Sequence, residues 1–129
     1  MSDEYITYEG KCHCGRIHFT IRSKPITTGV RCNCSICRRK NAVMSSKYYD
    51  PPDFQLLSGE EALSVYTFNE EETYHYFCKQ CGIYPFHGPD QYRVNLGCID
   101  NIDLEKLNIR VFDGRHTWRF FDQIERSGK

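Results

Sequence analysis

The chain has 129 residues, a length within the common size range of a single domain with one hydrophobic core. Its 17 basic and 17 acidic side chains cancel, so no overall field draws it to nucleic acid or to an anionic membrane. No apolar stretch approaches the roughly 20 residues that cross a bilayer, and the start, MSDEYITYEG, lacks the features of a signal peptide. We therefore expect one domain over residues 1–129 in a cytoplasmic protein that binds neither nucleic acid nor membrane.

Most of the apolar pattern has a period of two residues, which is typical of strands with one buried face. The predicted strands cover residues 16–22, 54–59, 64–68, 73–77 and 93–96. The acidic run Asn-Glu-Glu-Glu at residues 69–72 lies between two of them and is interpreted as a solvated hairpin tip. The pattern predicts a mainly β protein built from twisted antiparallel sheets.

Helix is scarce in this pattern. One or two turns are expected at residues 35–41, which begin inside a cysteine cluster. A second short helix is expected at residues 103–107, where Asp103 is a candidate N-cap. Neither segment is long enough to form a layer of its own.

Seven of the eight cysteines fall into three short clusters. The clusters are Cys12-His-Cys14, Cys32-Asn-Cys34-Ser-Ile-Cys37 and Cys78-Lys-Gln-Cys81. A disulfide framework is the alternative interpretation, because small secreted domains are also rich in cysteine. However, cysteines one or two residues apart rarely bridge each other without strain, whereas the same spacing suits a thiophilic metal such as zinc.

Two clusters supply two cysteines each, enough for one closed four-cysteine site, and the third cluster supplies three cysteines for an open site. Glycine follows Cys14 and Cys81, and it allows a positive φ that turns backbone amides toward thiolate sulfurs. Two such turns form a zinc-ribbon-like pair of knuckles. We therefore expect a structural four-cysteine zinc at Cys12, Cys14, Cys78 and Cys81. The three cysteines Cys32, Cys34 and Cys37 would hold a second zinc with its fourth position open to water or substrate.

Three motifs together resemble the glutathione-dependent formaldehyde-activating enzyme family. They are Gly10-x-Cys-His-Cys-Gly15, Cys32-Asn-Cys-Ser-Ile-Cys37 and Phe77-Cys-x-x-Cys-Gly-Ile-Tyr84, and Asn95-Leu-Gly-Cys-Ile-Asp100 is similar to a later block of the family. The resemblance implies a mainly β, zinc-ribbon-like fold shared with a Rab-binding chaperone and with methionine-R-sulfoxide reductases. It also implies carbon–sulfur lyase chemistry, in which an aldehyde such as formaldehyde joins glutathione or a related thiol to give S-hydroxymethylglutathione.

The chemistry of the three-cysteine group is compatible with that activity, which makes Cys32, Cys34 and Cys37 the catalytic candidates. A thiol bound at the open position loses its proton to become a nucleophile for an aldehyde. Zinc can instead polarise the carbonyl oxygen as a Lewis acid. Three thiolates already give a divalent ion a net negative charge, so the first role is favoured, although the sequence does not exclude the second.

Candidate substrate-binding residues follow the open site. Arg38, Arg39 and Lys40 match the two carboxylates of glutathione, since guanidinium binds carboxylate in a bidentate way. A solvated basic face on a short helix is the alternative. His87, in a turn-rich loop after the second knuckle, is the best of the histidines for proton transfer or substrate contact.

Cys98 is the odd cysteine and lies at the end of a predicted strand. A small buried hydrophobic residue is its simplest role. The alternatives are a fourth ligand to the open site and a redox thiol.

Two other functions compete with the lyase. A non-enzymatic zinc module that binds a protein partner is one, as the related chaperone and centromere protein V suggest, and fold alone does not decide function. A sulfoxide reductase acting through Cys98 is the other, although only Arg93 lies near in sequence to lower its pKa.

Overall fold

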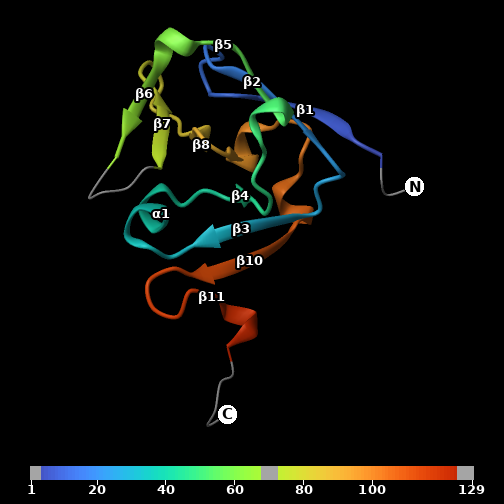
Figure 1. Cartoon of the computed structure of the whole chain (residues 1–129), viewed down its shortest axis with the longest axis vertical. Coiled ribbons are helices and arrows are strands. Elements are labelled where there is room, and N and C mark those ends of the chain that lie inside the picture. The colour runs from blue at the N-terminus through green and yellow to red at the C-terminus, as the bar shows by residue number, and fades with distance from the viewer. Residues whose placement is uncertain (1–3, 68–72, 125–129) are drawn as a thin grey trace.

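The computed structural model describes residues 4–67 and 73–124, and it is mainly β, as predicted (Figure 1). Its strands are β1 Ile6–Lys11, β2 His18–Ser23, β3 Thr28–Cys32, β4 Met44–Ser45, β5 Phe54–Ser58, β6 Leu63–Tyr66, β7 Tyr74–Cys78, β8 Phe86–Gly88, β9 Arg93–Val94, β10 Asn108–Asp113 and β11 Arg119–Phe120. The only α-helix in the described part of the chain is α1, Ser35–Lys40. Short 3₁₀ turns cover Pro51–Asp53, Glu60–Ala62, Leu96–Cys98, Leu104–Lys106 and Phe121–Gln123.

The first sheet has the order β1-β2-β5 and is antiparallel throughout. The alternation predicted for residues 16–22 is confirmed, because Ile17, Phe19 and Ile21 are fully buried on one face. Gly10 of β1 lies opposite Phe19, and the lack of a side chain there leaves room for the aromatic ring. This sheet therefore places its buried face against the rest of the molecule.

The third sheet, β6-β7-β8-β9, supplies the other side of the same core. Phe86 of β8 packs edge-on against Phe19 and Phe54, with ring centroids 5.3 and 4.7 Å apart. Tyr92 stacks on Phe54 at 3.9 Å, which extends the aromatic contact. Aromatic pairs in these geometries add about 0.5–1.5 kcal/mol each to the burial of their area. The first and third sheets are therefore joined through aromatic rings.

The second sheet, β11-β10-β3-β4, departs from the antiparallel prediction. Its two inner strands, β3 and β10, run parallel, with Cys32 opposite Phe112. A parallel pair needs a crossover connection, and here the chain between the two strands forms β4 to β9, which include the whole third sheet. In Figure 1 both strands lie side by side below α1, so the C-terminal part of the chain reaches the cysteine-rich end of β3.

Other expected elements are correct in kind but differ in extent. The pairing of β6 with β7 confirms two adjacent strands, while the expected hairpin tip at residues 69–72 lies outside the described residues. The expected helix at residues 103–107 is only a 3₁₀ turn, in which Asp103 accepts a hydrogen bond from the Glu105 amide. The strand expected to end at Leu96 ends at Val94 instead. No helix in the described ranges has the length and apolar character needed to span a bilayer.

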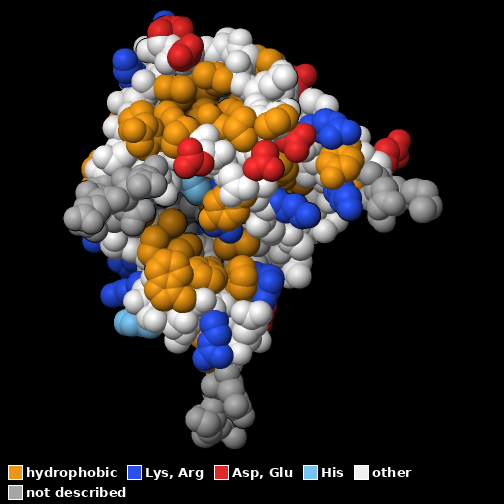
Figure 2. Space-filling model, viewed as in Figure 1, with side chains coloured by type: hydrophobic (Ala, Val, Ile, Leu, Met, Phe, Trp, Pro, Cys, Tyr) orange, Lys and Arg blue, Asp and Glu red, His pale blue; other side chains and the backbone are white. Residues whose placement is uncertain are grey.

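Apolar side chains also gather on the surface shown in Figure 2, over the part of the molecule that β5 and β6 occupy in Figure 1. A shallow groove there is lined by Phe54, Leu56, Glu60, Leu63, Val65, Tyr76, Phe86 and Tyr92. Phe54 and Phe86 remain buried, so the groove lies over the aromatic core without exposing these two rings.

The contact between Gly10 and Phe19 generates a stability prediction. A Cβ atom on Gly10 would lie 2.3 Å from Phe19 Cζ, so Gly10→Ala forces the ring out of the aromatic core. We expect a loss of about 1–3 kcal/mol in the free energy of unfolding, measured by denaturant titration. Thr7→Ala on the exposed side of the same strand is the control and should change stability by less than about 0.5 kcal/mol. Equal effects of the two changes would contradict this packing role.

Candidate metal centres and the cavity between them

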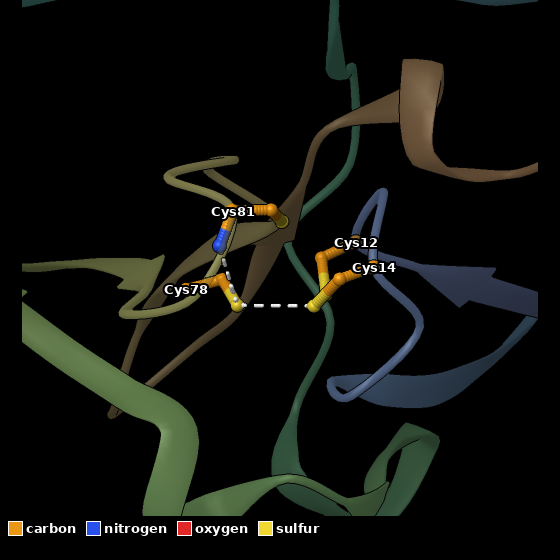
Figure 3. A group of neighbouring side chains, drawn as sticks. All are labelled: Cys12, Cys14, Cys78 and Cys81. Carbon is orange, nitrogen blue, oxygen red and sulfur yellow. Dashed lines mark hydrogen bonds between the residues drawn. The ribbon is translucent and has the colours of Figure 1, made fainter.

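The four predicted knuckle cysteines converge from two distant hairpins (Figure 3). Cys12 and Cys14 lie in the turn between β1 and β2, and Cys78 ends β7 just before Cys81. The Sγ atom of Cys14 lies 3.6 Å from that of Cys12 and 3.6 Å from that of Cys78. Zinc–sulfur bonds of about 2.3 Å in a tetrahedron separate the sulfurs by about 3.8 Å. The four thiols therefore have the spacing that such an ion requires.

Backbone amides around these sulfurs complete the knuckles. The Ile17 amide donates to Cys12 Sγ at 3.3 Å, and the Gln80 amide donates to Cys78 Sγ at 3.3 Å. Gly15 and Gly82 have φ values of 84° and 78° with open space around them, so they are needed for backbone conformation and not for room. The positive φ predicted for both glycines is confirmed, and the amide donors in these turns stabilise thiolate charge.

The second group is built on one short segment. Cys32 ends β3, Cys34 precedes α1 and Cys37 lies within it, so that their three sulfurs lie within 4.8 Å of one another. The Cys34 amide donates to Cys32 Sγ at 3.5 Å. No fourth His, Cys, Asp or Glu among the described residues joins them. The group can hold a thiophilic ion and leaves one coordination position open.

The three thiols differ in their electrostatics. Burial raises the pKa of Cys37 to about 12. Burial also opposes ionisation of Cys34, but hydrogen bonds from the Cys37 amide and thiol outweigh it and lower the Cys34 pKa. Cys34 is therefore the thiol that ionises first in the absence of a metal, and binding of a metal must displace the protons of the other two.

A small cavity of about 20 Å³ lies beside this group. It is lined by Val30, Cys32, Cys37, Lys40, Ala42, Met44, Tyr84, His87 and Arg93. Two of the predicted substrate residues, Lys40 and His87, thus come together with the cysteines. Tyr84 and Arg93 were missed as site residues, although Tyr84 ends the second knuckle motif. Only the tertiary structure brings them to the cysteines.

Apart from the cysteines and Tyr84, the ionisable side chains that line this cavity are basic residues and a histidine. Burial lowers the pKa of Lys40 to about 8, while the neighbouring cysteines act in the opposite direction. Lys40 Nζ lies 2.8 Å from His75 Nδ1. Burial, together with Lys40, lowers the pKa of His75 to about 4, and that of His87 falls to about 3 for the same reasons. Both imidazoles are therefore neutral near pH 7, and His87 can accept a proton only weakly.

A larger cleft of about 570 Å³ opens on the other side of α1. It is lined by Ser35, Ile36, Arg39, Lys40 and Tyr66. Of the three predicted basic residues, Arg39 and Lys40 line this cleft, whereas Arg38 is exposed and does not. Lys40 lines both spaces, so the cleft and the cavity meet at its side chain.

The loop after β10 covers the three-cysteine group, which the sequence did not reveal. Asn33 Nδ2 donates to Asp113 Oδ1 at 2.9 Å, and the Arg115 amide donates back to Asn33 Oδ1 at 3.0 Å. Thr117 donates to Asp113 through its amide and its hydroxyl. A Cβ atom on Gly114 would lie 2.7 Å from Cys32 Sγ, so only glycine fits there. The buried Asp113 therefore fixes this loop against the cysteines.

Cys98 belongs to neither group, and the idea that it is a fourth ligand to the open site is wrong. It lies in the 3₁₀ turn Leu96–Cys98 and not at a strand end. Burial raises the pKa of its thiol to about 12, and negative charge on the nearby Cys12 and Cys81 would also raise it. A thiol held this strongly in its protonated form is a poor nucleophile, which counts against the reductase hypothesis.

Mutations in the two cysteine groups should destabilise the protein to different extents. Cys12→Ser or Cys81→Ser removes a ligand that joins two sheets, so unfolding should become easier by more than about 4 kcal/mol, or the protein should be insoluble. Cys34→Ser should remove one metal equivalent with a much smaller shift in Tm, because its group lies within one segment. Thermal unfolding and metal analysis of the three variants test this. Similar destabilisation by all three would contradict the division into structural and open sites.

The Asn33–Asp113 contact predicts an effect on the open site alone. Asp113→Asn replaces an acceptor with an amide that cannot accept from both Asn33 and Thr117, which frees the loop over Cys32. We expect metal affinity at the three-cysteine group to fall about tenfold, as for other residues that orient ligands. Asp122→Asn is the matched control, because Asp122 makes an exposed ion pair with Arg110. Competition with a metal chelator measures both, and equal affinities would contradict the role of Asp113.

Comparison with known proteins agrees with this geometry. The model of the family described as "Glutathione-dependent formaldehyde-activating enzyme" matches residues 7–115, which include both cysteine groups and end two residues after Asp113. A crystal structure of a Rhodobacter sphaeroides protein, a Northeast Structural Genomics target, is similar with a TM-score of 0.66 and 28% sequence identity. The similarity covers 78% of this chain and 98% of that chain. The chain therefore belongs to the glutathione-dependent formaldehyde-activating enzyme family.

Proposed function

We propose that this protein is a zinc-dependent carbon–sulfur lyase that joins formaldehyde to glutathione and so forms S-hydroxymethylglutathione. The observation that carries the proposal is the three-cysteine group with one open position, which lies beside a cavity and next to a basic cleft. Membership of the family supports glutathione and formaldehyde as the substrate classes.

Two zinc ions per chain follow from the proposal. The four-cysteine group would hold a structural ion, since all its positions are filled by protein sulfurs. Cys32, Cys34 and Cys37 would hold the second ion. When bound, this ion would lower the pKa of an incoming thiol. Lys40 offsets the negative charge of the three thiolates, which interact with its ammonium group. Its position between cavity and cleft allows it to do so while it contacts either substrate.

Glutathione would occupy the cleft along α1. The volume of about 570 Å³ lies in the range of about 300–1,000 Å³ that small-molecule sites show. Arg39 and Lys40 supply positive charge for the two carboxylates of the tripeptide, and Arg39 Nη1 already donates to the Ser35 carbonyl at 2.9 Å, which holds its guanidinium against the helix. The thiol can then reach the cysteine group through the side of the cleft that Lys40 shares with the cavity.

The central test is product formation by the metal-loaded protein. With ¹³C-formaldehyde and glutathione, NMR should show the S-hydroxymethyl adduct forming faster than in a protein-free control, and the Cys34→Ser variant should lose this acceleration. A protein that holds two ions but does not accelerate the reaction with any thiol would favour the non-enzymatic, partner-binding module instead.

The cleft also predicts which basic residue selects the thiol. Arg39→Glu should weaken glutathione binding by roughly 1–3 kcal/mol, because a charge-assisted hydrogen bond is replaced by repulsion. Arg38→Glu makes the same charge change outside the cleft and is the matched control, for which a much smaller effect is expected. Calorimetric titration with glutathione, cysteine and an uncharged thiol measures the difference. Equal affinity for all three thiols, or equal losses in both variants, would count against glutathione in this cleft.

A further inference from the structure

The hydroxyl group of Tyr84 is buried and has no hydrogen-bond partner. Among the side-chain nitrogen and oxygen atoms that are buried in the described residues, it is the one left unsatisfied. Leaving such a group unpaired costs about 1–3 kcal/mol, so proteins rarely keep one without a reason. Tyr84 also lines the small cavity beside the three-cysteine group, so a molecule bound there can supply the missing partner.

The ring of Tyr84 is fixed, so the hydroxyl cannot turn out to water. The Lys40 ammonium lies 3.5 Å from the ring centroid on one side. The His87 ring lies nearly parallel at 6.4 Å, with an angle of 13° between the planes. The backbone is held as well, because Asn95 Nδ2 donates to the Tyr84 carbonyl at 2.8 Å. The position of the hydroxyl is therefore set before any substrate binds.

The cavity that Tyr84 lines favours an oxygen atom with partial negative charge. Lys40 and Arg93 are also in its wall, and its lining includes no carboxylate. Arg93 is itself held in place, since its Nε donates to the Ser45 carbonyl at 2.7 Å. Cys32 and Cys37 form another part of the wall, so a molecule in this space lies against the open cysteine group.

The size of the cavity limits what can enter. A single water molecule needs about 10–15 Å³ of such space. The space of about 20 Å³ is only slightly larger, and the buried Met44 is part of its wall. It accepts the smallest carbonyl compounds, whereas each added carbon of a longer aldehyde has to displace a side chain.

We propose that this cavity is the aldehyde subsite and that the Tyr84 hydroxyl donates a hydrogen bond to the carbonyl oxygen of formaldehyde. The inference rests on the proposed function and adds a catalytic residue to it. The thiol sulfur forms a bond to the carbonyl carbon, and the π electron pair of the C=O bond moves to the oxygen. The proton that the thiol released to water returns from water to this oxygen, which gives the S-hydroxymethyl group.

Tyr84 acts as a donor at each stage of this step. Burial raises the pKa of its hydroxyl well above the ordinary range, so it remains a phenol near pH 7. A fixed donor stabilises the developing oxyanion more than the neutral carbonyl, and the loss of one such donor typically slows acyl-transfer enzymes by about 100- to 1,000-fold. An addition to an aldehyde develops a similar charge on oxygen.

The test is Tyr84→Phe, which removes one oxygen atom and keeps the ring. Metal content and glutathione affinity should not change, and Tm should be unchanged or higher, because an unsatisfied polar atom is lost. The kcat for adduct formation should fall by about 100-fold. Wild-type activity in the variant would overturn the inference.

A second measurement does not depend on turnover. Formamide does not react with thiols but has one heavy atom more than formaldehyde, so its binding is followed by saturation-transfer NMR in metal-loaded Met44→Ala, whose cavity is larger. We expect binding to Met44→Ala and at least fivefold weaker binding to the double variant Met44→Ala/Tyr84→Phe. If the wild type forms no adduct, the proposed function fails, and the formamide experiment still decides whether this hydroxyl binds a carbonyl oxygen. Equal formamide binding by both proteins would overturn the inference even if the wild type is an active lyase.

A separate variant tests whether the size of the cavity limits which aldehyde reacts. Met44→Ala enlarges the cavity and should raise the ratio of acetaldehyde to formaldehyde turnover at least fivefold. Val43→Ala is the matched control, because Val43 is equally well buried but belongs to the hydrophobic core and does not line the cavity. An unchanged ratio in Met44→Ala, or the same rise in Val43→Ala, would show that the aldehyde binds elsewhere.

Discussion

The contact between the two cysteine knuckles is the constraint on which the rest of the structure depends. It joins Cys12 and Cys14 to Cys78 and Cys81, across 64 residues between the sulfurs of Cys14 and Cys78. A link between segments so far apart removes much of the freedom of the unfolded chain, which a small core needs. The same link fixes where the chain leaves the second knuckle, and Tyr84 follows that knuckle within three residues. The geometry of the cavity thus depends on the structural group.

The two cysteine groups use the same side chain for different ends. In the knuckles, amides donate to the sulfurs and the protein fills every ligand position. In the three-cysteine group, the sulfurs come from the end of β3 and the start of α1. No other described His, Cys, Asp or Glu supplies a fourth ligand atom. The loop held by Asp113 covers one side of this group, while Lys40 and the cavity lie on another. An ion there would be held by the protein and remain accessible to a small molecule.

The two spaces around α1 differ in size. The cleft has a volume of about 570 Å³, whereas the cavity of about 20 Å³ is about the size of one small molecule. Lys40 lines both. Lys40 is half-buried, and burial lowers its pKa to about 8, so its ammonium group stays largely charged near pH 7 and can offset the charge of the neighbouring thiolates. In the proposed reaction, thiol and aldehyde would approach the same cysteines from different spaces.

Cysteine and glycine spacing predicted the membership of both cysteine groups from the sequence alone. Ligands one or two residues apart lie close in any folded state, so Cys32, Cys34 and Cys37 needed no tertiary information. Gly15 and Gly82 were equally informative, because a positive φ is a local requirement. The period of two residues likewise gave most of the strands in the first and third sheets, since alternation reports the burial of one face.

Contacts between distant segments were decided by the tertiary structure. The parallel pairing of β3 with β10 has no signal in either strand, yet it brings Asp113 to Asn33, 80 residues away. Tyr84 and Arg93 join the cavity because β8 and β9 turn toward β4. Cys98 was placed at a strand end by the pattern, but burial in a 3₁₀ turn beside the knuckles removed it from the open site. Periodicity records which face of a segment is buried, whereas the identity of the partner depends on packing of the whole chain.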